Sequence, residues 1–451
     1  MLSGNPKREK RGDKMKRLFH WLNRIPAFRD LTPEEFSWVL YDVGNSAYTM
    51  LACSLVPIWF KDLAIGTAPG QITGDQATAY YSLSISVITI IVALLGPILG
   101  ALADRKEAKK AFFSTTVAAG VIGCILNGFA WTWVLFLGVY ALTKILYQAS
   151  LTFYDSMLND ITTEERMDEV SSYGYAWGYI GSCIPFLVAM AAYILSGGLS
   201  ENLMLFPLYV GRVIGFAVTA VWWLLVTVPL IRNYRQRNYV ETEHTSIGQV
   251  FRRILGTLKK IAFRDRKVLF FLIAFFLYID GVGTIIDNCI NIGTDLGLPT
   301  VGQVVFLLGT QVVAWIGSLV FAGLSKKYRT VPLILVCIAG YFGVCLYALT
   351  LKTLLHFGIL AFGVGCFQGS IQSLSRSYYS KIIPPENSGE YFGIYDIFSK
   401  GASFLGSAVI AWVKLAGGTI NIAVASLAVF FALGFVFLII SSRYKRIRRA
   451  G

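Results

Sequence analysis

Residues 83–110 read LSISVITIIVALLGPILGALADRKEAKK, an apolar run followed at once by a basic turn. The run carries no charge over about 20 positions, the length that an α-helix needs to cross the hydrocarbon core of a bilayer. The pattern is continuous, whereas the strands of a membrane β-barrel alternate over about ten residues. The stretch therefore predicts a transmembrane helix that ends in a tight, positively charged connection.

Similar runs recur along the 451 residues, of which 55% are hydrophobic and 15% charged. So few charges cannot cover a soluble domain of this size, and a chain inside lipid must satisfy its backbone polar groups internally. We therefore predict an all-α polytopic membrane protein with twelve transmembrane helices in two six-helix bundles. The predicted spans are 37–60, 77–103, 111–130, 133–154, 173–196, 205–230, 267–290, 301–325, 330–350, 354–375, 389–414 and 419–441.

The net charge of +14 is distributed by topology. Of the 40 Lys and Arg, 34 lie in the two tails and the even-numbered connections. Only three lie in or beside the odd connections, and three lie inside helices. This asymmetry predicts that both termini are cytoplasmic, and it argues against a nucleic-acid partner. We expect a multi-pass protein of the cell membrane, with the lipid bilayer as a partner.

A basic polar stretch divides the helices six and six. We expect a basic cytoplasmic tail over 1–36, a first bundle over 37–231, a basic cytoplasmic linker over 232–266, a second bundle over 267–441 and a basic tail over 442–451. Two six-helix bundles joined in this way resemble the major facilitator superfamily (MFS), whose halves are parallel repeats.

The turn after the second helix supports this resemblance. Residues 100–110, GALADRKEAKK, are similar to the superfamily's signature Gly-x-Leu-Ala-Asp-Arg-x-Gly-Arg-Lys, with departures at Glu107 and Ala108. Residues 322–329, AGLSKKYR, resemble a degraded copy in the second half. The resemblance implies that Asp104 and Arg105 latch the two halves on the cytoplasmic side. The alternative is an ordinary positively charged loop.

A narrower resemblance spans most of the chain. Its motifs are YDVGNSAY at 41–48, YIDGVGTI at 278–285, QSLSRS at 372–377, IPP at 383–385, FGIY at 392–395 and SKGASFLG at 399–406. Together they resemble the vacuolar-effluxer-like MFS family, whose fungal members export amino acids from the vacuole. Val43 and Gly44 replace the family's usual Trp-Ala, a change that would reshape the pocket, so an amino-acid substrate does not follow automatically.

The sequence lacks the common enzyme signatures. It has no phosphate loop, no His-Glu-x-x-His and no Gly-x-Ser-x-Gly, and its seven cysteines form no CxxC pair. We expect no enzymatic activity, no cofactor and no metal site. Energy for transport would come from the substrate's own gradient or from a coupling ion, for which we predict a proton.

Charged residues within the spans are functional candidates because each costs about 2.5–3.5 kcal/mol near the bilayer centre. Asp42 and Asn45 share a face of the first helix, although Asp42 could instead cap it. Asp280, in the middle of the seventh helix, is the first candidate for a proton or substrate-ammonium site. Asp287 is expected at the exposed boundary, and Gly281 and Gly283 permit local unwinding.

Polar partners occur on other helices. Lys144 and Gln148 share a face of the fourth helix, and Asp396 and Lys400 share a face of the eleventh. The last two would either neutralise each other or leave Lys400 to hold a substrate carboxylate. Gln368 and Gln372 would hydrogen-bond a substrate. Arg376, on the same stripe, is interpreted as part of the positive-inside signal, and Arg212 is left ambiguous.

Acidic and basic groups around one cavity would suit a zwitterion. We therefore predict an MFS-type secondary transporter of a small polar solute, such as an amino acid, working by alternating access. Two alternatives stay open: a transporter of a sugar, drug or amphiphile, with sodium as a possible coupling ion, and a non-transporting membrane receptor or assembly factor.

Overall fold

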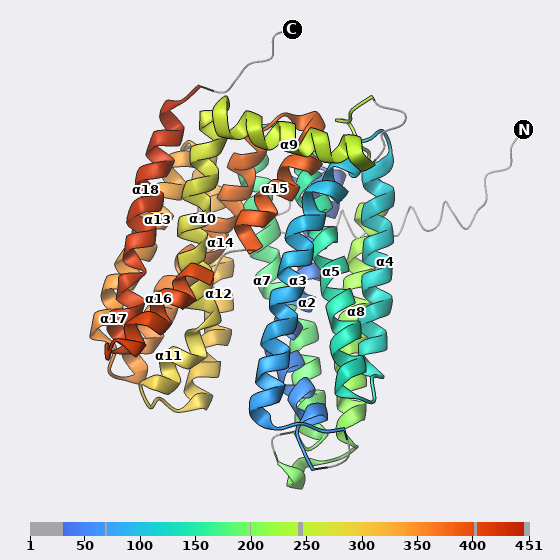
Figure 1. The fold of residues 1–451 in the computed structure, drawn as a ribbon, viewed down its shortest axis with the longest axis vertical. Helices are drawn as coiled ribbons and strands as arrows, with labels where there is room; N and C mark the ends of the chain where they lie inside the picture. The colour runs from blue at the N-terminus through green and yellow to red at the C-terminus, as the bar shows by residue number, and fades with distance from the viewer. Residues whose placement is uncertain (1–29, 68–69, 199, 242–246, 401–403, 446–451) are drawn as a thin grey trace, which may run out of the picture.

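The computed structural model describes residues 30–67, 70–198, 200–241, 247–400 and 404–445 (Figure 1). In the first half the helices are α2 (Pro33–Ala64), α3 (Gly74–Ala103), α4 (Ala108–Gly128), α5 (Trp133–Ser156), α6 (Leu158–Ile161), α7 (Met167–Leu195) and α8 (Leu208–Asn233), with a 3-10 turn at Glu201–Leu203. Together these helices form the first of the two bundles.

The second half holds α10 (Arg266–Asp287), α11 (Cys289–Asp295), α12 (Thr300–Ser325), α13 (Thr330–Tyr347), α14 (Leu354–Ile382), α15 (Ser388–Lys400), α16 (Phe404–Leu415), α17 (Ile420–Ser426) and α18 (Ala428–Arg443). Two 3-10 turns, Ala348–Thr350 and Pro385–Asn387, join them. Between the halves lies α9 (Ile247–Phe263). The described chain is thus helical almost throughout, and the predicted fold class is confirmed.

Ten segments of the described residues are long and apolar enough to cross a membrane. The 32-residue α2 and the pair α15–α16 complete the twelve expected spans. The predicted eleventh span over 389–414 is represented by α15, described as far as Lys400, and by α16, described from Phe404, with residues 401–403 outside the described part of the chain. Helix α10 stays helical through Gly281 and Gly283 to Asp287, so the local unwinding that these glycines would permit is not seen in this structure.

The first helix begins four residues earlier than predicted because a capping box fixes its start. The Thr32 hydroxyl accepts a hydrogen bond from the Glu35 amide at 3.2 Å, and the Glu35 carboxylate accepts one from the Thr32 amide at 2.8 Å. Pro33 occupies the first turn, where its missing N–H costs nothing. These contacts satisfy the exposed end of the helix and place Asp42 more than two turns inside it, so Asp42 does not cap α2.

Each half has its own hydrophobic core. The first contains Trp38, Trp59 and Trp223, and the second contains Tyr278 and Tyr341 among many aliphatic side chains. Glycines bring the helices close. A Cβ on Gly178 of α7 would lie 3.2 Å from the Asp42 carbonyl oxygen of α2, and one on Gly365 of α14 would lie 3.1 Å from the Thr310 carbonyl of α12. The absence of a side chain at these two glycines therefore lets the helices pack closely.

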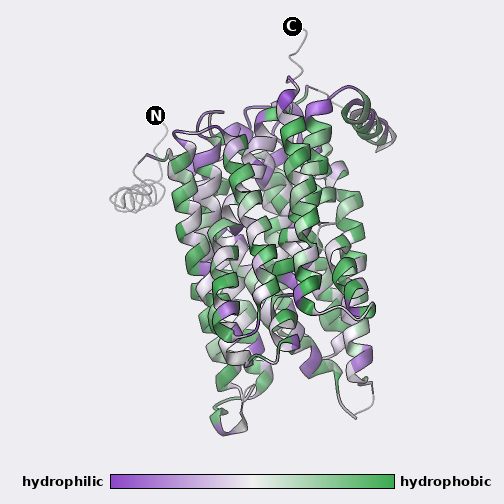
Figure 2. Cartoon of the chain, turned by 90° about the vertical axis from the view of Figure 1, so that its left-hand side faces the viewer, coloured by the Kyte–Doolittle hydropathy of each residue, from purple (hydrophilic) through white to green (hydrophobic). Residues whose placement is uncertain are grey.

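The predicted linker contains a helix that the sequence interpretation missed. Helix α9 runs across the top of Figure 1, roughly perpendicular to the spans, and Figure 2 views it nearly end-on beside the bundle. Val250 and Ile254 pack on Ala101 of α3, while Ile261 joins the core of the second half. The linker therefore contacts both bundles.

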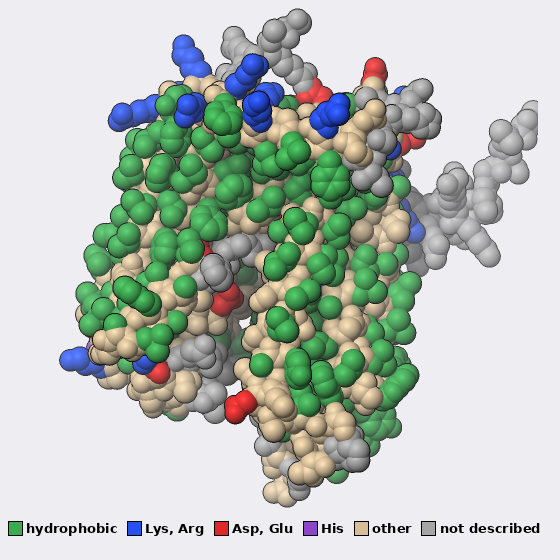
Figure 3. Space-filling model, in the orientation of Figure 1, with side chains coloured by type: hydrophobic (Ala, Val, Ile, Leu, Met, Phe, Trp, Pro, Cys, Tyr) green, Lys and Arg blue, Asp and Glu red, His purple; other side chains and the backbone are tan. Residues whose placement is uncertain are grey.

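The two ends of the molecule differ. The end that carries α9 and the α3–α4, α8–α9 and α12–α13 connections is rich in Lys and Arg (Figure 3), and we call it the basic end. The sides are hydrophobic. A hollow with acidic side chains at its wall lies between the halves and opens toward the opposite, far end (Figure 3). The halves thus meet at the basic end and part toward the far end.

Candidate transport site and its gate

Helices α3 and α15 cross backbone to backbone at the basic end. A Cβ on Gly100 would lie 2.0 Å from the Gly389 carbonyl oxygen, and one on Gly393 would lie 2.5 Å from the Gly96 carbonyl. Real Cβ atoms do not approach so closely, so the crossing admits only glycine at these positions. The four glycines, spaced four apart on each helix, let the two halves touch without intervening side chains.

Asp104 joins the halves at the end of this crossing. Its carboxylate accepts hydrogen bonds from the backbone amides of Gly389 at 2.7 Å and Glu390 at 2.9 Å, at the start of α15. A carboxylate there also interacts favourably with the helix dipole. Arg253 of α9 lies 2.7 Å from Glu390 and 3.9 Å from Asp104. The signature turn therefore contacts the opposite half directly.

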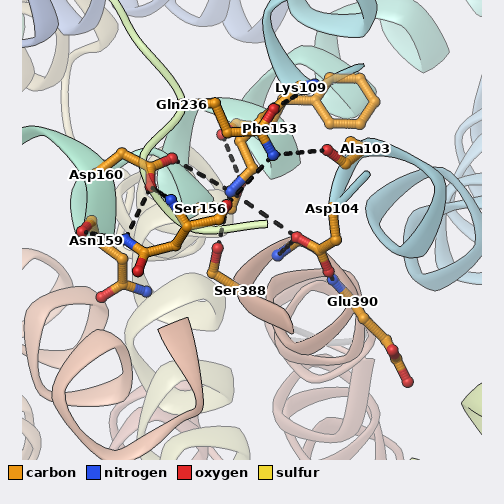
Figure 4. A network of polar contacts seen from close by, with 12 residues as sticks. Ala103, Asp104, Lys109, Phe153, Ser156, Asn159, Asp160, Gln236, Ser388 and Glu390 are labelled. Atoms are coloured by element: carbon orange, nitrogen blue, oxygen red, sulfur yellow. Dashed lines mark hydrogen bonds and ion pairs between the residues drawn. The ribbon is translucent and has the colours of Figure 1, made fainter. Parts of the chain in front are cut away.

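Lys109 lies at the centre of the polar network in Figure 4 and is fully buried. Its ammonium donates to the Ser388 hydroxyl at 2.8 Å and lies 3.5 Å from Asp160 and 3.8 Å from Asp104. Burial raises the pKa of the Asp104 carboxyl to about 7, against the lowering influence of Lys109 and the α15 amides. Lys109 and Arg253 are thus the cations that face Asp104, while Arg105 is half-buried beside Val240 of the linker.

The second contact between the halves is made by α7. The Asp168 carboxylate accepts hydrogen bonds from the hydroxyls of Thr330 and Ser377, both at 2.6 Å, and pairs with Lys381 at 2.7 Å. Lys326, which replaces the acidic residue of the signature in the second half, pairs with Glu169 at 2.8 Å. Side-chain donors hold this side together, including the Ser171 hydroxyl, which donates to the Ser373 carbonyl at 2.8 Å.

Arg376 reaches from α14 into the first half, and its interpretation as a topological charge is wrong. The side chain is 3% exposed and its guanidinium lies 3.1 Å from Asp42 and 3.0 Å from Asp155. It also donates to the Ser171 hydroxyl at 3.0 Å and lies over the rings of Trp38 and Tyr175. Two carboxylates therefore share one buried guanidinium across the interface. We call Asp42, Asp155 and Arg376 the charge cluster.

Two predicted candidates adjoin the charge cluster. The Asn45 amide donates to Asp42 at 2.9 Å, on the same helix face. The carboxylate of Asp396 on α15 accepts a hydrogen bond from the Thr152 hydroxyl of α5, which again joins the two halves. The side chain of Lys400 lies outside the described part of the structure, so its pairing with Asp396 stays a prediction.

Other candidates lie farther from the basic end. The Tyr179 hydroxyl of α7 lies within reach of the side chains of Gln368 and Gln372 on α14. Lys144 is half-buried, with its ammonium 5.4 Å from the ring centroid of Tyr147, and Gln148 is also half-buried on the same helix. The structure thus distributes the polar candidates over facing helices of both halves.

Lys144 of the first half and Asp287 of the second both influence the thiol of Cys53 on α2 electrostatically. Asp287 is exposed, as expected.

Arg212 is buried at the far end, where it donates to the carbonyls of Gly128 at 3.2 Å and Ala130 at 2.6 Å. It therefore stabilises the end of α4.

Asp280 is fully buried and contacts the first residues of α16. Its carboxylate accepts hydrogen bonds from the amides of Leu405 at 3.2 Å and Gly406 at 2.6 Å, at the start of α16. A Cβ on Gly406 would lie 2.2 Å from the Thr284 hydroxyl, so α10 and α16 are in close contact. This contact between α10 and α16 is a role of Asp280 that the sequence pattern did not indicate.

The departure from the family motif in the first helix lies inside the first half. A Cβ on Gly44 would lie 2.5 Å from Val226 of α8, and Val43 packs against Gly181 of α7. Residues 43 and 44 therefore contact helices of their own bundle. The expectation that this change reshapes the pocket is not supported by these contacts.

Two residues of the charge cluster escaped the sequence interpretation. Asp155 and Arg376 each follow directly after a predicted span, at 133–154 and 354–375, whereas α5 continues to Ser156 and α14 to Ile382. Both therefore seemed to belong to solvated connections. Their opposite charges, each at the same end of a span, were the available signal, but only the docking of the halves brings them together.

Comparison with known proteins gives the class first. The chain aligns over 92% of its length with 99% of the MFS transporter FucP in its outward conformation, with a TM-score of 0.70 and 16% identity, which shows a shared fold. It is 40% identical over 413 residues to the uncharacterized MFS-type transporter YxiO of Bacillus subtilis (strain 168), covering 90% of this chain and 94% of the relative. The protein is therefore a multi-pass membrane protein with the architecture of an MFS-type transporter.

The family follows from residues 32–451, which match the model described as "Vacuole effluxer Atg22 like". The chain belongs to this family, as its motifs predicted. Autophagy-related protein 22 of Botryotinia fuckeliana is 28% identical over 303 residues, covering 59% of this chain and 48% of the relative. The match thus spans about half the length of this fungal relative.

Proposed function

We propose that this protein moves a small polar solute across the membrane by alternating access, with its basic end in the cytoplasm. The observation that carries the proposal is the asymmetry of the interface. Most of the hydrogen bonds and ion pairs described above that join the halves lie on the basic side, among them those of Asp168 on α7 with Thr330 and Lys381. The hollow opens the other way (Figure 3). Such a molecule would present a central site to one side at a time.

An amino acid is the substrate class that we infer. Lys144 offers a cation for a carboxylate, and the amides of Gln368 and Gln372 offer hydrogen bonds. Carboxylates in the same region, among them Asp287, suit an ammonium group. The match to a vacuole-effluxer family is consistent with export of a small metabolite. The role of Asp280 as a proton or ammonium site stays a prediction.

A proton is the coupling ion that we infer, and the charge cluster is the group that would bind it. Asp42 and Asp155 share the guanidinium of Arg376 in a buried interface, so one negative charge of the three groups is not neutralised within the cluster. Separating the halves at the basic end would withdraw Arg376 from both carboxylates. Proton binding would then substitute for the lost cation and link protonation to the conformational change.

Transport by reconstituted protein tests both inferences. Vesicles holding the wild-type chain should accumulate a labelled amino acid when a pH gradient is imposed, and Asp42→Asn should uncouple uptake from that gradient. Glu165→Gln, which changes an exposed carboxylate at the same end, serves as the matched control. Uptake of a sugar but of no amino acid would contradict the inferred substrate class. Uptake driven by a sodium gradient would contradict the proton as the coupling ion. Well-folded protein that moves no solute at all would favour a receptor.

A further inference from the structure

The linker helix α9 has three distinct faces. Val250, Ile254, Thr257 and Ile261, spaced four, three and four residues apart, form the buried face that packs on the bundle. A second apolar stripe, Phe251, Leu255 and Leu258, is shifted by one residue and is therefore about 100° around the helix. These three side chains are exposed, Leu255 by 65%. Of the two apolar stripes, the described residues of the chain cover only the first.

The third face is basic. Arg252, Lys259 and Lys260 are exposed on it, and Arg264 follows the end of the helix. Helix α9 lies roughly perpendicular to the spans at the level of the basic end (Figures 1 and 2). An apolar stripe flanked by Lys and Arg, on a helix parallel to the bilayer plane, has the chemistry of an interfacial helix on an anionic lipid surface.

Arg253 connects this helix to the gate. It projects from the edge of the buried face that lies away from the exposed apolar stripe, and it pairs with Glu390 of the second half and lies 3.9 Å from Asp104 of the first. Val250 and Ile254 rest on α3, whereas Ile261 rests on the second bundle. Helix α9 therefore spans both halves in the arrangement in which their basic ends touch, and separating those ends must detach it from one of them.

We propose that α9 is a membrane-surface helix whose binding to anionic phospholipid headgroups favours the closed basic end. The lipid would bind most strongly when α9 lies flat across both halves, and Arg253 would transmit this preference to Glu390 and Asp104. A ligand shifts a conformational equilibrium only through such a difference in affinity. The direction of the effect rests on the alternating-access proposal, whereas the location of α9 at the lipid surface does not.

The location is tested on the full chain, in a background without its seven cysteines, by spin labels at Leu255→Cys and Arg252→Cys. In vesicles containing phosphatidylglycerol, the label at 255 should be accessible to oxygen and the label at 252 to a water-soluble nickel chelate. Equal exposure of both labels to the chelate would overturn the proposal. Dipolar broadening between labels at 255 would also overturn it, since a second copy would then cover the stripe.

The effect on the gate is tested with labels at Lys106→Cys and Arg443→Cys, one in each half at the basic end. Adding phosphatidylglycerol to phosphatidylcholine vesicles should favour the closed basic end. The ratio of short to long distances between the labels at 106 and 443 should therefore rise several-fold. Lys259→Gln with Lys260→Gln should remove most of this response, whereas Lys327→Gln with Arg329→Gln, an equal loss of charge elsewhere, should keep it. The same ratio in both lipids would contradict the proposal. These distances need no transported solute, so absence of transport would leave the result interpretable.

Discussion

The α3–α15 and α7–α14 contacts close the same end of the molecule by different means. At the first, four glycines bring two backbones together and Asp104 caps the opposing helix. At the second, Arg376 and Asp168 make ion pairs and hydrogen bonds across the interface. The α3–α15 contact forms only because its glycines have no side chains, whereas the α7–α14 contact depends on paired charges. A sterically tight contact resists added atoms, whereas a buried ionic contact resists loss of either partner.

The largest effect is expected for Arg376→Gln, which leaves Asp42 and Asp155 without their shared cation. Removing one partner of a buried ion pair costs about 3–5 kcal/mol. The closed basic end should therefore lose population strongly, as measured by the distance between labels at 106 and 443. Arg376→Lys keeps the charge but not the two-sided geometry and should fall between wild type and Gln. A wild-type distance distribution in the Gln variant would contradict the assigned role.

The next effect concerns volume. Gly100→Ala places a methyl group against the Gly389 carbonyl and should destabilise the closed basic end by about 1–3 kcal/mol. Gly138→Ala on α5 is the matched control, because a Cβ there meets no atom within 4 Å. The same pair of labels measures both variants. If the two alanine variants behave alike, the backbone crossing does not limit closure.

The third prediction is a pH dependence. The pKa of Asp104 is raised to about 7 when the gate buries it and should return toward its usual value of 3.8 when the gate opens. Below pH 4 both states are protonated. As the pH rises from 4 to 7 only the open state loses its proton, so the closed state is disfavoured by up to about 1.4 kcal/mol per pH unit.

Lys109, Asp160, Arg253 and Glu390 also surround Asp104, so the control must isolate its own titration. Between pH 5 and pH 8, rising pH should shift the label distances toward opening more strongly in wild type than in Asp104→Asn, which retains only the opposite response expected from the charge cluster. A pH response of equal size in Asp104→Asn would assign the titration to another group.

The smallest effect tests the turn between α3 and α4. Glu107 has φ = 60°, a left-handed backbone conformation that is strained for residues other than glycine. The superfamily signature has glycine at this position. Glu107→Gly should therefore raise the melting temperature slightly, by a gain of no more than about 1 kcal/mol. Lys106→Gly, at the neighbouring exposed position, should lower it. A loss in both variants would indicate that the strain is absent in solution.

The fold was predictable because its main determinants are local. Apolar runs, basic turns and capping residues such as Thr32 are readable along the chain, and the Asp104 motif indicated a contact between the halves. The charge cluster was not predictable, because Asp155 and Arg376 are 221 residues apart and meet only when the bundles dock. The contact of Asp280 on α10 with the backbone amides of Leu405 and Gly406 also joins residues far apart in the sequence, so the sequence pattern could not indicate it.

Helix α9 was readable in principle, since apolar residues recur along 247–263 at helical spacing. The abundance of Lys and Arg in the linker obscured that pattern. The composition of this segment therefore indicated its side of the membrane, while the spacing of its apolar residues indicated a helix.

The central claim is that the two ends of the molecule open in alternation. It is tested most directly by measuring two label pairs in the same reconstituted protein: Lys106→Cys with Arg443→Cys at the basic end, and Leu203→Cys with Leu415→Cys at the far end. As a transported amino acid and a pH gradient are applied, one distance should lengthen while the other shortens. Two distances that change together, or that do not change during measurable transport, would contradict the account.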